Sequence, residues 1–172
     1  ASLLDEATAT AEAVGLSQRL DKTNSKKIFI SNNCNPQTID LIKTRTNPFG
    51  LELIIGDEKK ELTKINDDII CGVLSYPGTL GEINDPSESI SLIHKKNGKA
   101  ILVCDLLALA RLKTPAELGA DIAVGSAQRF GIPMGYGGPH AAFFATKEEF
   151  KRSMPGRIIG VSKDRHGKKA YR

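Results

Sequence analysis

Asp105 stands where a carboxylate of this chain is well placed to meet a ligand. It directly follows residues 100–104, an apolar run typical of a buried strand, so its side chain should emerge at the carboxyl edge of a sheet. Parallel sheets bind their ligands beyond that edge. Asp105 is also a good N-cap for a short helix from Leu106 to Arg111. From these residues alone, the helix cap is the favoured interpretation.

A glycine-rich loop between residues 125 and 138 is a second candidate for contact with a ligand or partner. Its glycines allow positive φ angles or close backbone approach, at an entropic cost that a plain surface connector need not bear. Arg129 in this loop can hold a carboxylate or phosphate by a two-pronged hydrogen bond, or pair with an acid across an interface. A structural arginine bonded to loop carbonyls is the alternative that we favour. The five glycines are Gly125, Gly131, Gly135, Gly137 and Gly138.

The segment from Ser75 to Thr79 (Ser-Tyr-Pro-Gly-Thr) is a third candidate at the same edge, because it ends another apolar run. The proline that follows Tyr76 favours an extended conformation for that residue. A plain type II turn with Pro77 and Gly78 at its centre explains the same residues.

Nucleotide and metal motifs are missing from the sequence. Residues 135–140 differ from GxGxxG because His140 takes the place of the third glycine and a strand, instead of a helix, follows. The pattern GxxxxGK[ST] does not occur. His94 and His166 have no metal-ligand partner at a useful spacing, so we expect both at the surface and predict no metal site.

Apolar and helical segments alternate along the chain, which predicts an α/β fold. The mostly parallel sheet should carry helices on both faces, connected by right-handed crossovers. Without a repeat or linker, one domain is expected. Helices are expected at 2–20 (capped by Ser2), 36–46 and 85–96 (capped by Asp85 and stopped by Asn97-Gly98), strands at 27–30, 51–55, 69–75, 100–104, 120–124 and 140–145, and a hairpin at 161–172 that turns at His166-Gly167.

Composition excludes several classes of protein. An apolar share of 40% permits a core, and a net charge of +4 with dispersed lysines makes nucleic-acid binding a weak expectation. No apolar run approaches the length of a membrane span. Three cysteines without CxxC spacing indicate small buried hydrophobes in a reducing compartment.

Three stretches closely resemble the glycine decarboxylase family, the P-protein of the glycine cleavage system. They are ASLLDEATATAEA at the start, SAQRFGIPMGYGGPHAAFFA, and MPGRIIGVSKD after it. The resemblance runs over nearly all 172 residues and is tightest from Asp105 to Lys163. That family has two homologous halves, each similar to a fold-type I pyridoxal-phosphate (PLP) enzyme. The resemblance implies that residues 1–172 are a single partial domain, most of the large PLP-binding domain of the N-terminal half.

The resemblance also gives roles to individual residues. In fold-type I enzymes an aspartate at the end of such a strand pairs with the pyridine nitrogen of PLP, which makes this role of Asp105 as plausible as the helix cap. The family's second half carries its Schiff-base lysine in the motif HKTF, and Gln128 stands at that position here, followed by Arg129 and Phe130. Neither a glutamine amide nor a protonated guanidinium can make the covalent bond. We therefore expect PLP to be bound covalently by the other half, with Asp105 and Gln128 as cofactor contacts and no catalytic residue in this chain.

Four more residues are expected in the pocket or in the contact between the halves, namely Tyr76, Arg129, Tyr136 and His140. The complete protein, by resemblance, removes CO2 from glycine and passes the aminomethyl group to a lipoyl carrier protein. Its expected partners are the catalytic second half and the lipoyl carrier, in a homodimer or heterotetramer, in the cytoplasm or, in a eukaryote, in the mitochondrial matrix. Two alternatives remain, a non-catalytic interaction subunit of a split enzyme and a free-standing relative of PLP aminotransferases, which Gln128 argues against.

Overall fold

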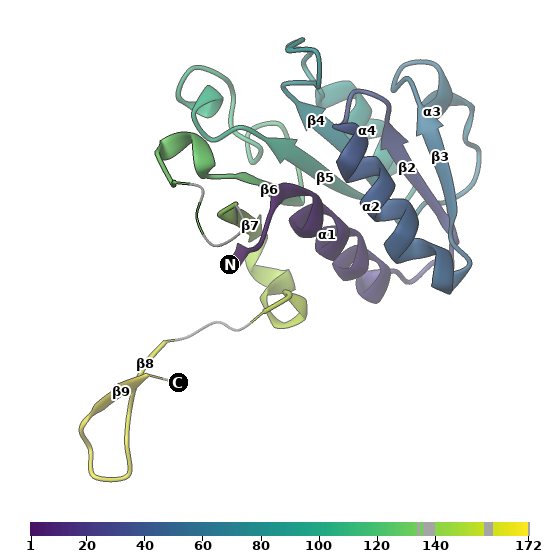
Figure 1. The fold of residues 1–172 in the computed structure, drawn as a ribbon. Helices are drawn as coiled ribbons and strands as arrows, with labels where there is room; N and C mark the ends of the chain where they lie inside the picture. The colour runs from purple at the N-terminus through teal and green to yellow at the C-terminus, as the bar shows by residue number, and fades with distance from the viewer. Residues whose placement is uncertain (134, 136–139, 157–159, 172) are drawn as a thin grey trace.

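The computed structural model describes residues 1–133, 135, 140–156 and 160–171. Strands and helices alternate along the chain as the sequence predicts (Figure 1). The elements are β1 (Ser2–Leu3), α1 (Glu6–Leu20), β2 (Lys27–Ser31), α2 (Pro36–Thr46), β3 (Glu52–Gly56), α3 (Glu61–Lys64), β4 (Cys71–Tyr76), α4 (Ser87–Lys95), β5 (Lys99–Cys104), β6 (Ile122–Ser126), β7 (Ala142–Thr146), β8 (Val161–Lys163) and β9 (Lys169–Tyr171), with short 3-10 turns at Asn47–Phe49, Ala108–Ala110, Gln128–Phe130 and Glu148–Ser153.

Seven strands form one sheet in the order β1-β7-β6-β5-β4-β2-β3. The five strands from β6 to β3 are parallel, whereas β7 and β1 run antiparallel to their neighbours at one side. The sheet is therefore mostly parallel, which confirms the expected α/β fold. The β8 and β9 strands form the expected separate hairpin, in which Gly167 takes the positive φ angle of the turn.

The sheet has an apolar core on each face, because successive side chains of a strand point to opposite sides. On one face α1 and α2 cover β2, β4, β5, β6 and β7, with Leu16 and Ile42 fully buried (Figure 1). On the other face α3 and α4 cover the strands around β4, and Ile93 of α4 packs there with Leu74 and Leu102. Helices on both faces confirm the predicted layering.

The first helix and the helix expected after Asp105 both differ from the sequence-based expectation. The first helix begins at Glu6 instead of Ser2, because Asp5 is its N-cap and accepts a hydrogen bond from the amide of Thr8 at 2.7 Å. Ser2 lies instead in β1 and pairs with Phe143. The expected helix after Asp105 is only a 3-10 turn, Ala108–Ala110.

The helix α4 begins at Ser87, one residue after Pro86, the first helical residue that a cap at Asp85 predicts. Asp85 still contributes to its start, because its Oδ1 accepts hydrogen bonds from the amide and hydroxyl of Ser87. Asn97 has φ 56° directly after the helix, which confirms the predicted stop. Among the helices of the described residues, none is long and apolar enough to cross a membrane.

Candidate functional site

The carboxyl edge of the sheet brings Asp105 and Arg129 together. Asp105 follows β5 and Arg129 lies in the 3-10 turn after β6, and these two strands are parallel neighbours. The Arg129 guanidinium donates a hydrogen bond to Oδ2 of Asp105, forming an ion pair. Oδ1 of Asp105 accepts a hydrogen bond from the amide of Leu107 at 3.0 Å. Both carboxylate oxygens are thus engaged within the chain, one by the amide of Leu107 and one by the arginine; Asp105 is not the predicted helix cap, because Leu107 is the N-cap of the 3-10 turn that follows.

This ion pair is a positioning contact rather than a large source of stability. Arg129 has 61% of its side-chain surface exposed and Asp105 has 21%. Pairs of this exposure contribute about 0–1 kcal/mol. The pair fixes where the loop after β6 lies relative to the end of β5.

A small pocket of about 220 Å³ lies beside Asp105, at the same edge of the sheet. Glu6, from the first turn of α1, contributes its carboxylate and accepts a hydrogen bond from Nδ2 of Asn35 at 2.9 Å. The hydroxyl of Thr79 in turn donates to Oδ1 of Asn35 at 2.8 Å. The pocket is lined by Glu6, Asn35, Ser75, Pro77, Gly78, Thr79, Val103, Cys104 and Asp105.

The rim pocket, as we call this pocket beside Asp105, is anionic. Burial raises the pKa of the Glu6 carboxyl above its usual value, the hydrogen bond from Asn35 opposes that rise, and the nearby charge of Asp105 adds to it. His140, an exposed residue, lowers the same pKa by its charge. The sequence analysis does not identify Glu6 or Asn35 as pocket residues.

Tyr76 is buried in the core on the α4 side of the sheet, with 5% of its surface exposed, and it does not line the rim pocket. The type II turn after it was a wrong prediction. Gly78 lacks the positive φ that such a turn requires, and the amide of Thr79 bonds to the carbonyl of Asn33 at 2.8 Å. The Tyr76–Pro77 peptide bond is cis. The turn thereby holds Thr79 against Asn35.

Gln128 is half-buried in the 3-10 turn after β6, and its backbone N–H donates a hydrogen bond to Oγ of Ser126 at 3.2 Å. Gly131 ends the turn with φ 96°, as the glycine content of the loop predicts. Tyr136 lies outside the described residues.

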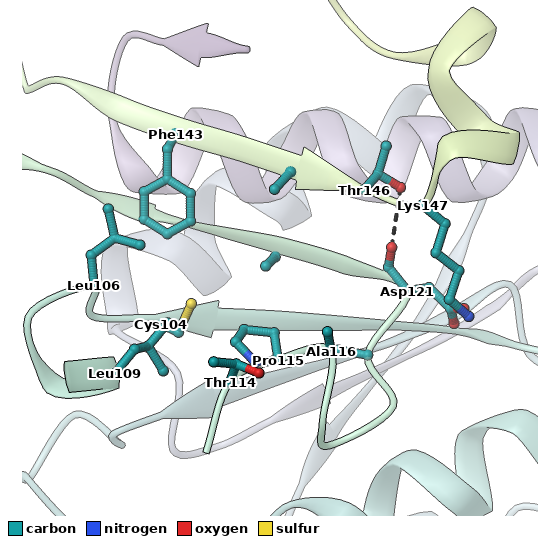
Figure 2. Close-up of a pocket in the computed structure, with 13 residues that line it drawn as sticks. Cys104, Leu106, Leu109, Thr114, Pro115, Ala116, Asp121, Phe143, Thr146 and Lys147 are labelled. Carbon is teal, nitrogen blue, oxygen red and sulfur yellow. Dashed lines mark hydrogen bonds and ion pairs between the residues drawn. The ribbon is translucent and has the colours of Figure 1, made fainter. Parts of the chain in front are cut away.

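A second hollow, an apolar groove of about 430 Å³, lies over β5, β6 and β7 on the α4 side of the sheet (Figure 2). Its floor includes Phe143 and its far wall is the connection from Leu106 to Ala116. It is lined by Cys104, Leu106, Leu109, Thr114, Pro115, Ala116, Ala120, Asp121, Ala123, Phe143, Ala145, Thr146 and Lys147.

Asp121 closes one end of this groove as a buried carboxylate. It accepts hydrogen bonds from the amide of Ala100 and from Nε2 of His94, each at 2.8 Å, and from the ammonium of Lys147. Burial alone would raise the pKa of Asp121, but these donors together hold it below its usual value. His94 is exposed, as the sequence analysis expects, and its ring bonds to this buried carboxylate, which joins α4 to the start of β6.

The described residues do not fit a covalently bound PLP. The rim pocket has two carboxylates and no lysine in its lining, so it offers neither the covalent anchor nor a cation for the phosphate. The Oδ2 of Asp105 that would pair with a pyridine nitrogen is already bound to Arg129. Within the described part of the chain, no cluster of three metal-ligating side chains occurs.

Comparison with known proteins places the chain in a family. The sequence profile of the glycine cleavage system P-protein matches residues 1–172. Over all 172 residues the chain is 76% identical to a glycine dehydrogenase (decarboxylating) of Pelagibacter ubique and 51% identical to that of Rhizobium meliloti, and it spans 18% of the length of each.

Solved structures agree with this match. A crystal structure of glycine decarboxylase (P-protein) of the glycine cleavage system in an inhibitor-bound form aligns with a TM-score of 0.86 and 32% identity, over 99% of this chain and 39% of that one. Cystathionine gamma-lyase from Lactobacillus plantarum shares the fold, with a TM-score of 0.69 and 18% identity over 88% of this chain and 39% of that one. The chain therefore belongs to the glycine cleavage system P-protein family.

Proposed function

We propose that the longer protein containing these residues is a glycine dehydrogenase (decarboxylating). It would release CO2 from glycine and transfer the aminomethyl group to a lipoyl carrier protein. PLP, held by the second half, would supply the electron sink for that reaction when bound. The proposal rests on the family match and on the similarity to proteins with that name.

The role of this segment in that protein is to build the enzyme rather than to carry the cofactor. The observation that supports this role is the ion pair between Asp105 and Arg129, directly beside Gln128. Gln128 cannot form the covalent bond, and the Arg129 guanidinium supplies a positive charge at the oxygen of Asp105 that a pyridinium would otherwise meet. The Arg129 guanidinium is thus an internal substitute for the protonated pyridine nitrogen of PLP.

With that substitute in place, the 3-10 turn Gln128–Phe130 is held without a ligand. The backbone of the turn is held at one side by Gly131 and at the other by Ser126. We propose that this turn, with Gln128 and with His140, faces the catalytic half and completes its pocket, and that Tyr136, which lies outside the described residues, belongs to the same contact. Tyr76 would contribute from behind, as part of the core that supports the Pro77 turn.

The second candidate is a non-catalytic interaction subunit in a split enzyme, which binds a catalytic partner of the same family. The anionic rim pocket favours it, because Glu6 and Asp105 would repel the phosphate of PLP. Both candidates imply a catalytic partner, glycine and the lipoyl carrier as proposed partners, in a homodimer or heterotetramer. The three buried free cysteines, Cys34, Cys71 and Cys104, support a reducing compartment such as the cytoplasm.

The test is a PLP titration of the full-length protein, followed by borohydride reduction and peptide mapping. Label is expected on a lysine outside residues 1–172. Label on a lysine within them, such as Lys113 or Lys147, would contradict the proposed role.

Three variants separate positioning from catalysis. Arg129→Ala should speed amide exchange in the loop after β6, while Arg129→Lys, which keeps the charge, should restore much of the protection. Asp105→Asn should have the same effect on the loop and leave glycine turnover nearly intact. A large fall in turnover with normal assembly would instead mean that the Asp105 charge acts in the reaction.

A further inference from the structure

The β8–β9 hairpin carries most of the net charge of the chain. Residues 160–171 contain four cationic side chains and one acid, so the hairpin has +3 of the chain's net charge of +4. The acid, Asp164, serves the turn, because its Oδ1 accepts hydrogen bonds from the backbone N–H groups of His166 and Lys168. No ion pair within the described part of the chain involves the cations of this basic hairpin, which are Lys163, Arg165, Lys168 and Lys169.

One face of the basic hairpin combines two lysines with two apolar side chains. Lys163 lies directly opposite Lys169, and Val161 lies directly opposite Tyr171. Because opposite residues, and residues two apart along a strand, point to the same side, all four side chains share this face. Val161 and Tyr171 are 66% and 74% exposed.

This face is unfavourable for a hairpin that stands alone. Like charges directly opposite each other destabilise a pair of strands, and an isolated two-stranded hairpin is marginally stable in water. The hairpin forms a sheet of its own, and its side chains are exposed or half-buried (Figure 1). The face therefore suits a partner surface that supplies carboxylates beside exposed apolar side chains.

The chain has a surface of that kind at the carboxyl edge of its sheet. Residues 65–93 include no lysine or arginine, and residues 80–88, which we call the acidic loop, hold three acids. Leu80 is 90% exposed, the highest value for a large apolar side chain among the described residues, and Ile83 is also exposed. Apolar side chains exposed among charges are typical of a protein interface. The acids are Asp85, which pairs with Lys113, and Glu82 and Glu88, which form no ion pair with a described residue.

We infer that the basic hairpin of one copy of the longer protein docks on the acidic loop of a second copy. The lysines meet the acids of the loop, and the apolar pair of the hairpin covers Leu80 and Ile83, so both charge and exposed apolar surface are complementary. Each copy offers both surfaces, which lets the contact form twice about a two-fold axis and close a dimer.

The docked hairpin also lies close to the rim pocket of the second copy. The acidic loop is tied to that pocket, because the carbonyl of Glu82 accepts a hydrogen bond at 2.9 Å from the backbone N–H of Gly78, which lines it. The cations of one copy are thus brought toward the anionic rim pocket of the other.

The contact requires the proposed assembly, since a homodimer and a heterotetramer both contain two copies of this segment. Its tests measure contact between copies and neither PLP binding nor glycine turnover. The proposed function and the docking of the hairpin can therefore fail separately.

Cross-linking between two variants of the full-length protein tests the contact. Leu80→Cys and Tyr171→Cys, with different tags, are co-expressed and treated with a short bismaleimide. We expect cross-linked peptides that join position 80 of one variant to position 171 of the other, a product that cannot form within one chain. The matched control pairs Leu80→Cys with Phe49→Cys, at another exposed aromatic residue, and its yield should be at least about tenfold lower.

Two results of this experiment would overturn the inference. One is an equal yield from the control pair. The other is a cross-link that joins position 171 to the rest of its own chain, because the longer protein itself would then cover the hairpin.

Charge reversal measures the contribution of the lysines. In full-length Lys163→Glu/Lys169→Glu, the dissociation constant of the dimer, measured by analytical ultracentrifugation, should rise at least about tenfold. Adding Glu82→Lys and Glu88→Lys to the same chain should return it to within about threefold of the wild type, because opposite charges face each other again.

The control for charge reversal is Lys22→Glu/Lys26→Glu, at exposed lysines outside both surfaces, which should dimerise like the wild type. An unchanged dissociation constant in the hairpin variant, or no recovery in the correctly folded four-site variant, would contradict the docking of the hairpin. The cross-link decides the question if a charge variant does not fold.

Discussion

Gly125 in β6 allows a close approach of two backbones that any other residue would prevent. A Cβ atom added there would lie 2.1 Å from the carbonyl oxygen of Cys104 and 2.8 Å from a ring carbon of its cross-strand partner Phe143. Real Cβ atoms essentially never come within 3.0 Å of another heavy atom. Phe143 has a ring that can turn, but the Cys104 carbonyl belongs to β5 and can move only with the strand.

The expected cost of Gly125→Ala is about 3 kcal/mol. Overpacking a core costs about 1–3 kcal/mol, and a backbone obstacle places this case at the upper end of that range. Since each 1.4 kcal/mol corresponds to a factor of ten, local opening should become roughly a hundredfold more frequent. The displaced carbonyl precedes Asp105, so the ion pair with Arg129 should weaken as well.

Amide hydrogen exchange of the full-length protein, followed on peptides from β5 and β6, measures this opening directly. Gly15→Ala is the matched control, because Gly15 lies within α1 and a Cβ there makes only an ordinary contact of 3.5 Å with the Arg19 side chain. Alanine at that position should stabilise the helix by about 0.5–1 kcal/mol. Exchange in Gly125→Ala within a factor of three of the wild type would refute the reasoning from close approach.

Three further results are expected. Asp121→Asn should destabilise β6 by about 2 kcal/mol, because it removes the charge that the Lys147 ammonium meets and weakens the hydrogen bond to His94. Since the folded pKa of Asp121 is lowered, its stabilisation should be present above about pH 4 and be lost as pH falls through the folded pKa; urea titrations of the variant should not show that loss. Cys71 and Cys104, whose pKa values burial raises to about 12, should stay unlabelled by iodoacetamide at pH 8 until denaturant is added, as mass spectrometry would report. Ile93→Ala should cost about 3 kcal/mol in chemical denaturation by leaving a cavity against β4.

Most of the sheet could be predicted from the sequence because its strands are local apolar runs with clear stops. The edge could not. β1 has only two residues, and Ser2 becomes part of a strand through pairing with Phe143, a contact that no local pattern encodes. The long sequence separation between β1 and β7 also explains why the wrong helix cap was predicted. Ser2 and Asp5 are both good caps, and the pairing of β1 decides between them.

In the site too, individual residues could be predicted from the local sequence, whereas contacts between residues far apart in the chain could not. Asp105 and Arg129 were each predicted at the carboxyl edge, but their pairing depends on β5 and β6 being neighbours in the sheet. Glu6 and Asn35 come from the starts of two different helices and meet only because α1 and α2 lie on the same face. His94 lies at the surface as expected, but its bond to Asp121, which lies far along the chain, has no local sequence pattern that predicts it.

The place of the first residues in the sheet has a consequence for biosynthesis. The helix α1 packs against β4, β5, β6 and β7, and β1 pairs with β7, so α1 and β1 are synthesised before the strands that they contact. Until then the buried side of α1, including Val14 and Leu16, has no sheet to cover it. Such non-local assembly is slow and exposes apolar surface to aggregation. The helix α1 is therefore a segment of this domain where we expect a chaperone to bind during synthesis.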